Sequence, residues 1–133
     1  MVRDLHTAIR NYLVTSEIGV VGETLFIDDI PAKDVDNEVI TMFRVTGSVD
    51  TDQYVPIRKP TVQFLCYGRN KSAVIDKIEN VFCLFHQLPS NTQIDPAIDL
   101  IKVNTIQEPS FVFVDDEGRV QYTFNAIFYI REM

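Results

Sequence analysis

Cysteine and histidine are scarce in this chain of 133 residues, which contains two of each. Neither cysteine lies in a CxxC motif or at a Cys/His spacing that suits zinc, so the sequence predicts no metal site. Cys66 and Cys83 lie in the apolar runs Phe-Leu-Cys-Tyr and Val-Phe-Cys-Leu. Because unpaired cysteine behaves as a small hydrophobic residue, we expect both side chains to be buried.

Long apolar runs are also lacking. Charged residues or proline interrupt every candidate within about 10 residues, short of the roughly 18 that a membrane span needs. The N-terminal segment Met-Val-Arg-Asp-Leu-His has no apolar core of the kind that signal peptides contain. Apolar and charged fractions of 46% and 23% are typical of a globular protein. We therefore expect a single intracellular domain over residues 1–133.

Clustered positive charge is absent as well. The net charge is −7, and residues 15–53 contain nine acids against two bases. The largest basic excess lies in residues 54–69, where Arg58, Lys59 and Arg69 carry it. Duplex DNA binding requires clustered lysine and arginine, so the charge distribution argues against nucleic-acid binding as the main function.

Two helices and six strands follow from the apolar patterns. Three- and four-residue spacing of apolar residues predicts helices at 2–15 and 71–88, the second capped by Asn70 and ended by Pro89. Alternating or β-branched segments between turn residues predict strands at 25–27, 38–45, 61–67, 98–106, 111–114 and 120–131. Gly118 suits the positive φ of a tight turn between the last two strands. We expect an α+β fold, with a mixed, mostly antiparallel sheet packed against two α-helices and a C-terminal β-hairpin.

The segment 120–131 is the most regular strand of the sequence. Its even positions are apolar and its odd positions mostly polar, with Ile127 the exception. This alternation indicates one buried face and one face turned to water or a partner. The segment exceeds the usual length of about five or six residues, and we expect it to form a long edge that must be covered or used.

No catalytic arrangement is visible in the sequence. No serine lies in a Gly-x-Ser-x-Gly motif, and no glycine-rich loop precedes a helix in a phosphate-binding pattern. The acids that follow Asp28 do not keep the spacing of a calcium loop. His6 and His86 have no carboxylate at helical spacing, so we expect structural or surface roles for both. The sequence therefore offers no catalytic constellation.

A series of segments along nearly the whole chain follows a recognisable order. It consists of the N-terminal amphipathic helix, Leu25–Pro31, a strand that ends at Thr46-Gly47, a polar loop, Pro60–Phe64, Tyr67–Asn70, the second helix and the closing hairpin. This series resembles the tail terminator or head–tail joining proteins of long-tailed bacteriophages. In prophages such proteins are also described as minor capsid or tail-completion proteins. The shared features are a pattern of elements and include no catalytic signature.

The resemblance implies a structural virion protein without enzymatic activity or cofactor. Members of this family form a ring, commonly a hexamer, that stops tail-tube polymerisation and faces head-completion proteins on its other side. The expected partners are copies of the chain itself, the tail tube protein and a head-completion or connector protein. DNA is expected to pass through the channel without specific binding, and no membrane is involved. The expected location is the neck or tail top of the virion, after assembly in the cytoplasm of the bacterial host.

Residues 46–60 are expected to form a long irregular loop. The loop combines acids at Asp50 and Asp52, an isolated aromatic residue at Tyr54 and a base at Arg58. Loops of about 12–15 residues are uncommon in compact domains and are usually functional or disordered. We therefore name these four residues as candidate contacts to the tail tube or to a neighbouring subunit. A merely mobile connection is the alternative interpretation. Acids of residues 15–53 and 115–117 are candidates for lining the channel.

Three other functions stay open at this point, the last of them an uncharacterised hydrolase. A head-side stopper or other neck protein shares the small size and the ring geometry. A small ligand-binding regulatory domain would require a concave apolar pocket with convergent polar groups, which a sequence does not reveal.

Overall fold

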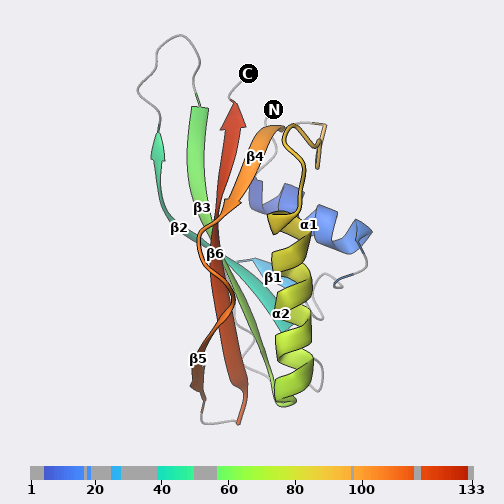
Figure 1. Ribbon diagram of the computed structural model, residues 1–133, viewed down its shortest axis with the longest axis vertical. Helices are drawn as coiled ribbons and strands as arrows, with labels where there is room; N and C mark the ends of the chain where they lie inside the picture. Colours follow the sequence, from blue (N-terminus) through green and yellow to red (C-terminus); the bar gives the residue numbers. More distant parts are fainter. Residues whose placement is uncertain are drawn as a thin grey trace.

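The structure, a computed structural model, describes residues 5–16, 18, 25–27, 39–49, 57–96, 98–115 and 118–131. Its elements are α1 (Leu5–Thr15), β1 (Leu25–Ile27), β2 (Val39–Val49), β3 (Ile57–Gly68), α2 (Lys71–His86), β4 (Asp99–Thr105), β5 (Ser110–Val114) and β6 (Val120–Arg131). Both predicted helices and all six predicted strands are therefore present (Figure 1).

The six strands form one sheet. β1, β2, β3, β6 and β4 are neighbours in that order, and β5 pairs with β6. β1 runs parallel to β2, whereas the other strand pairs are antiparallel. β5 and β6 form the expected C-terminal hairpin, whose turn contains Gly118 at φ +76°. The predicted α+β class and the mixed, mostly antiparallel sheet are confirmed.

β6 is not the exposed edge that its length suggested. β3 pairs with it from Gly68↔Val120 to Ile57↔Arg131. On its other side, β4 pairs with the second half of β6 and β5 with the first half. The prediction of an edge was wrong because two short strands together cover one side of the long strand. The edges that require cover are therefore those of β4 and β5.

The main core lies between the helices and one face of the sheet, as Figure 1 shows. Aromatic rings form its centre. The ring of Phe64 stacks on that of Phe124 with centroids 4.9 Å apart and meets Phe85 of α2 at 5.3 Å. Phe85 in turn meets Phe128 edge-on at 5.4 Å. These rings join α2 to β3 and β6, and their burial is a dominant stabilising contribution.

The second helix begins and packs as its sequence predicts. The Asn70 side chain caps α2 by accepting a hydrogen bond from the Ala73 amide at 3.2 Å. Its buried residues recur at three- and four-residue steps, at Val74, Ile78, Val81 and Phe85.

The burial expected for cysteine holds for Cys66 and is wrong for Cys83, which is exposed. Cys83 lies two residues from both Val81 and Phe85, about 200° around the helix from each of these buried positions. Its apolar neighbours in the sequence therefore do not bury it.

The predicted irregular segment 46–60 is strand at both ends, because β2 runs to Val49 and β3 begins at Ile57. Val45 pairs with Thr61 and Ser48 with Lys59, so Thr46 and Gly47 together face Pro60. Proline has no amide hydrogen to donate, and a bulge accommodates it within the ladder. The Thr-Gly and Pro signals therefore mark a β-bulge between paired strands rather than a loop.

Candidate functional site: an exposed apolar strand

The clearest surface feature of the described residues is β5. Four consecutive large apolar side chains, of Phe111, Val112, Phe113 and Val114, are between 42% and 54% exposed. We call these four residues the β5 patch. Ile106, shortly before the strand, is 51% exposed. Contiguous apolar surface of this kind on a small protein marks a site of interaction with another molecule.

The backbone of β5 is also incompletely paired. Its partner is β6, with Phe111 opposite Tyr122, Phe113 opposite Gln121 and an irregularity between these pairs. Among the described residues no strand pairs with the other side of β5. Monomeric proteins usually protect such an edge with charged residues or proline, and β5 has neither. An uncharged apolar edge is therefore expected to be covered by a partner.

The turn after β5 is held by an ion pair. The Asp115 carboxylate accepts hydrogen bonds from the Arg119 backbone amide at 2.8 Å and from Arg119 Nε at 2.7 Å. The Arg119 guanidinium lies over the Tyr67 ring, 5.1 Å from its centroid. Asp115 is thus bound within its own hairpin, although it is one of the acids suggested for the channel. These contacts fix the hairpin and present the β5 patch in a defined position.

The four residues named from the sequence fall differently in the structure. Asp50, Asp52 and Tyr54 lie outside the described residues. Arg58 is exposed, but it lies in β3 opposite Val49 and Ile130 rather than in a loop. The position of Arg58 is therefore fixed by the pairing of β3 with β2 and β6.

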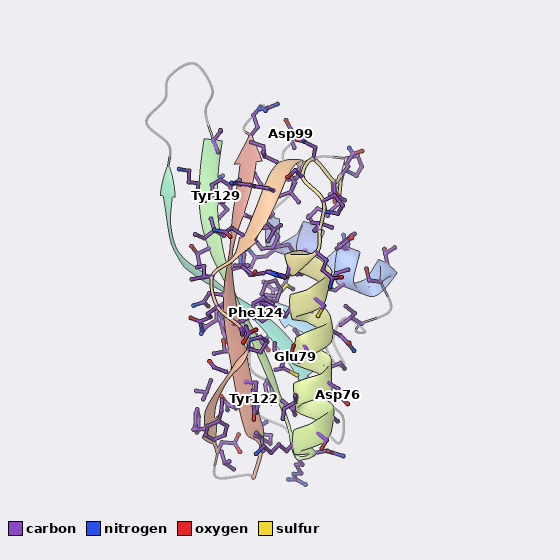
Figure 2. All side chains as sticks on the ribbon, viewed as in Figure 1. Asp76, Glu79, Asp99, Tyr122, Phe124 and Tyr129 are labelled. Atoms are coloured by element: carbon purple, nitrogen blue, oxygen red, sulfur yellow. The ribbon has the colours of Figure 1, made fainter. Side chains whose placement is uncertain are left out.

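Two cations lie near the ring of Tyr129, next to Ile130, the residue opposite Arg58. Lys102 Nζ and Lys59 Nζ lie 4.6 Å and 5.7 Å from the centroid of that ring. Arg131 pairs with Asp99 at 3.2 Å. In Figure 2, Tyr129 and Asp99 lie toward one end of the sheet and Tyr122, beside β5, toward the other. The basic end and the apolar end are separate surfaces.

Each histidine lies in one of the two described helices. His6 is buried in α1. His86 stacks on Phe82, and its Nδ1 lies 2.6 Å from Thr105 Oγ1, a contact that fastens the end of α2 to β4. Across the described parts of the chain, no three His, Cys, Asp or Glu side chains gather as metal ligands would. The described helices are too short or too polar to cross a membrane.

An open groove follows the outward side of α2. It is lined by the end of α1, with Ile18, and by α2 and the residues after it, including Asn80, Cys83, Leu84, Gln87 and Leu88. We call this surface the α2 groove. Asp76 and Lys77 also line it. The described lining residues thus combine apolar side chains, side-chain amides, one acid and one base.

Sequence reasoning located β5 as a strand but missed its exposure. A run of apolar residues without alternation is normally the sign of a strand buried on both faces. The one available signal is the position of the run, directly before the acidic turn 115–117.

A small α+β protein whose described residues leave an apolar strand exposed has a surface suited to assembly with other proteins. Comparison with known proteins identifies which assembly. The chain belongs to the bacteriophage tail terminator protein family, whose profile matches residues 12–131. It is accordingly a structural protein of the virion tail that interacts with other virion proteins.

A solved structure supports the fold. A chain in the virion of a native gene transfer agent particle superposes with a TM-score of 0.62, covering 96% of this chain and 95% of that one. The two sequences are 10% identical, so the likeness is one of fold alone. None of the curated proteins matches the chain.

Proposed function

We propose that this protein, as one domain over residues 1–133, forms a ring that caps the phage tail tube and joins it to the head connector. Six subunits are the expected number. The match of the tail terminator family to residues 12–131 carries the proposal. The β5 patch supports it, because ring assembly requires each subunit to cover apolar surface against another. The role is structural, without catalysis or cofactor, and DNA passes the ring without specific binding.

Light scattering of the protein alone and with purified tail tubes, followed by electron microscopy of the mixture, tests this function. A ring, or a cap at one end of each tube, is the expected result. A protein that ignores tubes and forms rings with head connectors would instead be a stopper or other neck protein. A protein that stays monomeric and binds neither tail tubes nor head connectors would favour a ligand-binding role.

We further propose that the end of the sheet where β2 ends and β3 begins contacts the tail tube, through Asp50, Asp52 and Tyr54 between β2 and β3 and through Arg58 in β3. β2 ends at Val49 and β3 begins at Ile57, and Figure 1 shows these strand ends at the opposite end of the sheet from β5. A ring subunit that meets its neighbours through one surface needs a different surface for the tube. The separation of the two regions is consistent with this division.

Combined substitution of Asp50→Asn, Asp52→Asn and Tyr54→Ala tests the contact, with Arg58→Ala made separately. Co-sedimentation with tail tubes is expected to fall in both variants while light scattering of the protein alone stays unchanged. Glu79→Gln, at an exposed position of α2, is the control for loss of one acid. Unchanged binding of tubes by both variants would contradict the assignment.

A further inference from the structure

We propose that the β5 patch of one subunit docks in the α2 groove of a second copy of the chain. The contact is head-to-tail, because the two surfaces belong to different parts of the molecule. This inference rests on the proposed ring and specifies how its subunits meet. The experiment below therefore distinguishes failure of the proposed ring from failure of the proposed contact.

The β5 patch is large enough to form the centre of such an interface. The four half-exposed side chains leave on the order of 350 Å² of apolar surface, divided between the two faces of the strand. A stable interface buries roughly 800 Å² on each partner, so the strand supplies its apolar centre and the surroundings its polar rim. Phe111 lies opposite Tyr122 and Phe113 opposite Gln121. Each face of the strand therefore carries one aromatic anchor, and the groove receives the strand edge-on.

The α2 groove offers the apolar surface and the hydrogen-bonding groups that can cover an exposed strand such as β5. Ile18, Leu84 and Leu88 provide apolar surface for the side chains of β5. The outer edge of β5 also carries backbone amide and carbonyl groups that need partners. Asn80 and Gln87 are exposed in the groove, and each side-chain amide provides both a donor and an acceptor.

Charge favours a second copy as the occupant. Copies of a chain with net charge −7 repel one another, and they associate most readily through surfaces that carry no net charge. The β5 patch has no charged residue. Among the described residues that line the α2 groove, the acid Asp76 is matched by the base Lys77. The two surfaces therefore meet without bringing like charges together.

The placement of the two surfaces suits a ring. In the view of Figure 1, β5 lies on the far side of β6 from α2. When a surface on one side fits a different surface on the other, the contact repeats from copy to copy and closes into a ring if the rotation allows. A patch that recognised itself would give a two-fold dimer instead.

Cys83 makes the contact directly testable, because it is exposed within the α2 groove while Cys66 is buried. Ser110→Cys places a second exposed thiol at the start of β5 with a minimal change of shape, and Val112→Cys places one in the patch itself. A short bismaleimide is then applied to each variant, alone and on purified tail tubes. Asn104→Cys, exposed on β4 outside the patch, is the matched control.

The expected result is a ladder of covalent oligomers for Ser110→Cys and Val112→Cys, lost when Cys83→Ser is added and absent for Asn104→Cys. Dimers that persist with Cys83→Ser would show β5 meeting β5 and would overturn the contact. Rings seen by light scattering or microscopy without this ladder would overturn the contact and leave the proposed function standing. Absence of any oligomer, with and without tubes, would overturn both.

Discussion

β4 and β5 pair with the same side of β6, yet the two strands are built differently. In β4, Leu100 is buried and Val103 packs against the core, whereas Lys102 and Asn104 are exposed. α2 packs against β4, and the His86–Thr105 contact fastens the two together. β5 is exposed along its whole length and carries no charge. One face of β4 is thus packed within the chain, while the side chains of β5 are left exposed for another molecule.

The cause of the difference is the reach of the second helix. α2 packs over β3, β6 and β4, so these strands have a covered face that selects alternating residues. β5 lies beside the first half of β6. The side chains of Phe111 to Val114 are about half exposed, so no described element covers the strand there. An apolar residue in β4 therefore stabilises the fold, whereas one in β5 is available for assembly.

The largest difference is expected in stability. Leu100→Ala on β4 removes a buried side chain and should lower the free energy of unfolding by about 3 kcal/mol, through lost burial and a residual cavity. Val112→Ala on β5 should cost less than about 1 kcal/mol, because the side chain is already half exposed. Urea denaturation followed by circular dichroism measures both. Equal losses would mean that β5 is as buried in solution as β4.

Assembly should respond in the opposite way. Phe113→Lys places a charge in the centre of the β5 patch and should weaken self-association by about 30-fold, equivalent to roughly 2 kcal/mol. Asn104→Lys introduces the same charge on the exposed side of β4 and should leave association unchanged. Light scattering across a concentration series compares the two variants, with unfolding curves to confirm that both fold. If Phe113→Lys assembles like the parent protein, β5 is not an interface.

Local signals were sufficient for much of this fold. Asn70 and the apolar stripe from Val74 to Phe85 define α2, and the alternation of residues 120–131 defines β6. The bulge opposite Pro60 was missed because Thr46 and Gly47 are turn residues in isolation. Their role as part of a ladder depends on the strand with which they pair.

The candidate site was harder to predict for a related reason. Residues 111–114 were identified as a strand, but burial of a strand depends on which layer reaches it, and this is a property of the whole fold. Cys83 shows the same limit. Its apolar sequence neighbours predicted burial, but the residue lies on the exposed side of a helix. Both errors concern exposure, which local pattern determines less well than element type.

The ion pair of the hairpin turn should affect β5 more than β4. Asp115→Asn keeps the shape of the side chain but removes the charge that pairs with the mostly buried Arg119. Loss of this charge-assisted hydrogen bonding should cost about 1–2 kcal/mol, concentrated in the β5–β6 hairpin. Hydrogen exchange should accelerate at the hairpin-bonded amides of β5 and stay unchanged in β4. Similar acceleration in both strands would indicate that the two share one unfolding unit.

The smallest effect is expected from a change in backbone conformation at the same turn. Gly118 has φ +76°, and a Cβ at this position would meet nothing within 4 Å. Gly118→Ala therefore introduces conformational strain without a clash and should cost about 1 kcal/mol. Gly118→Asn should cost less, because asparagine tolerates the left-handed region better than other residues. Thermal unfolding ranks the parent, Asn and Ala forms in that order of stability. An equal loss for Asn and Ala would mean that the turn does not retain its left-handed conformation in solution, and the fixed presentation of β5 would fail with it.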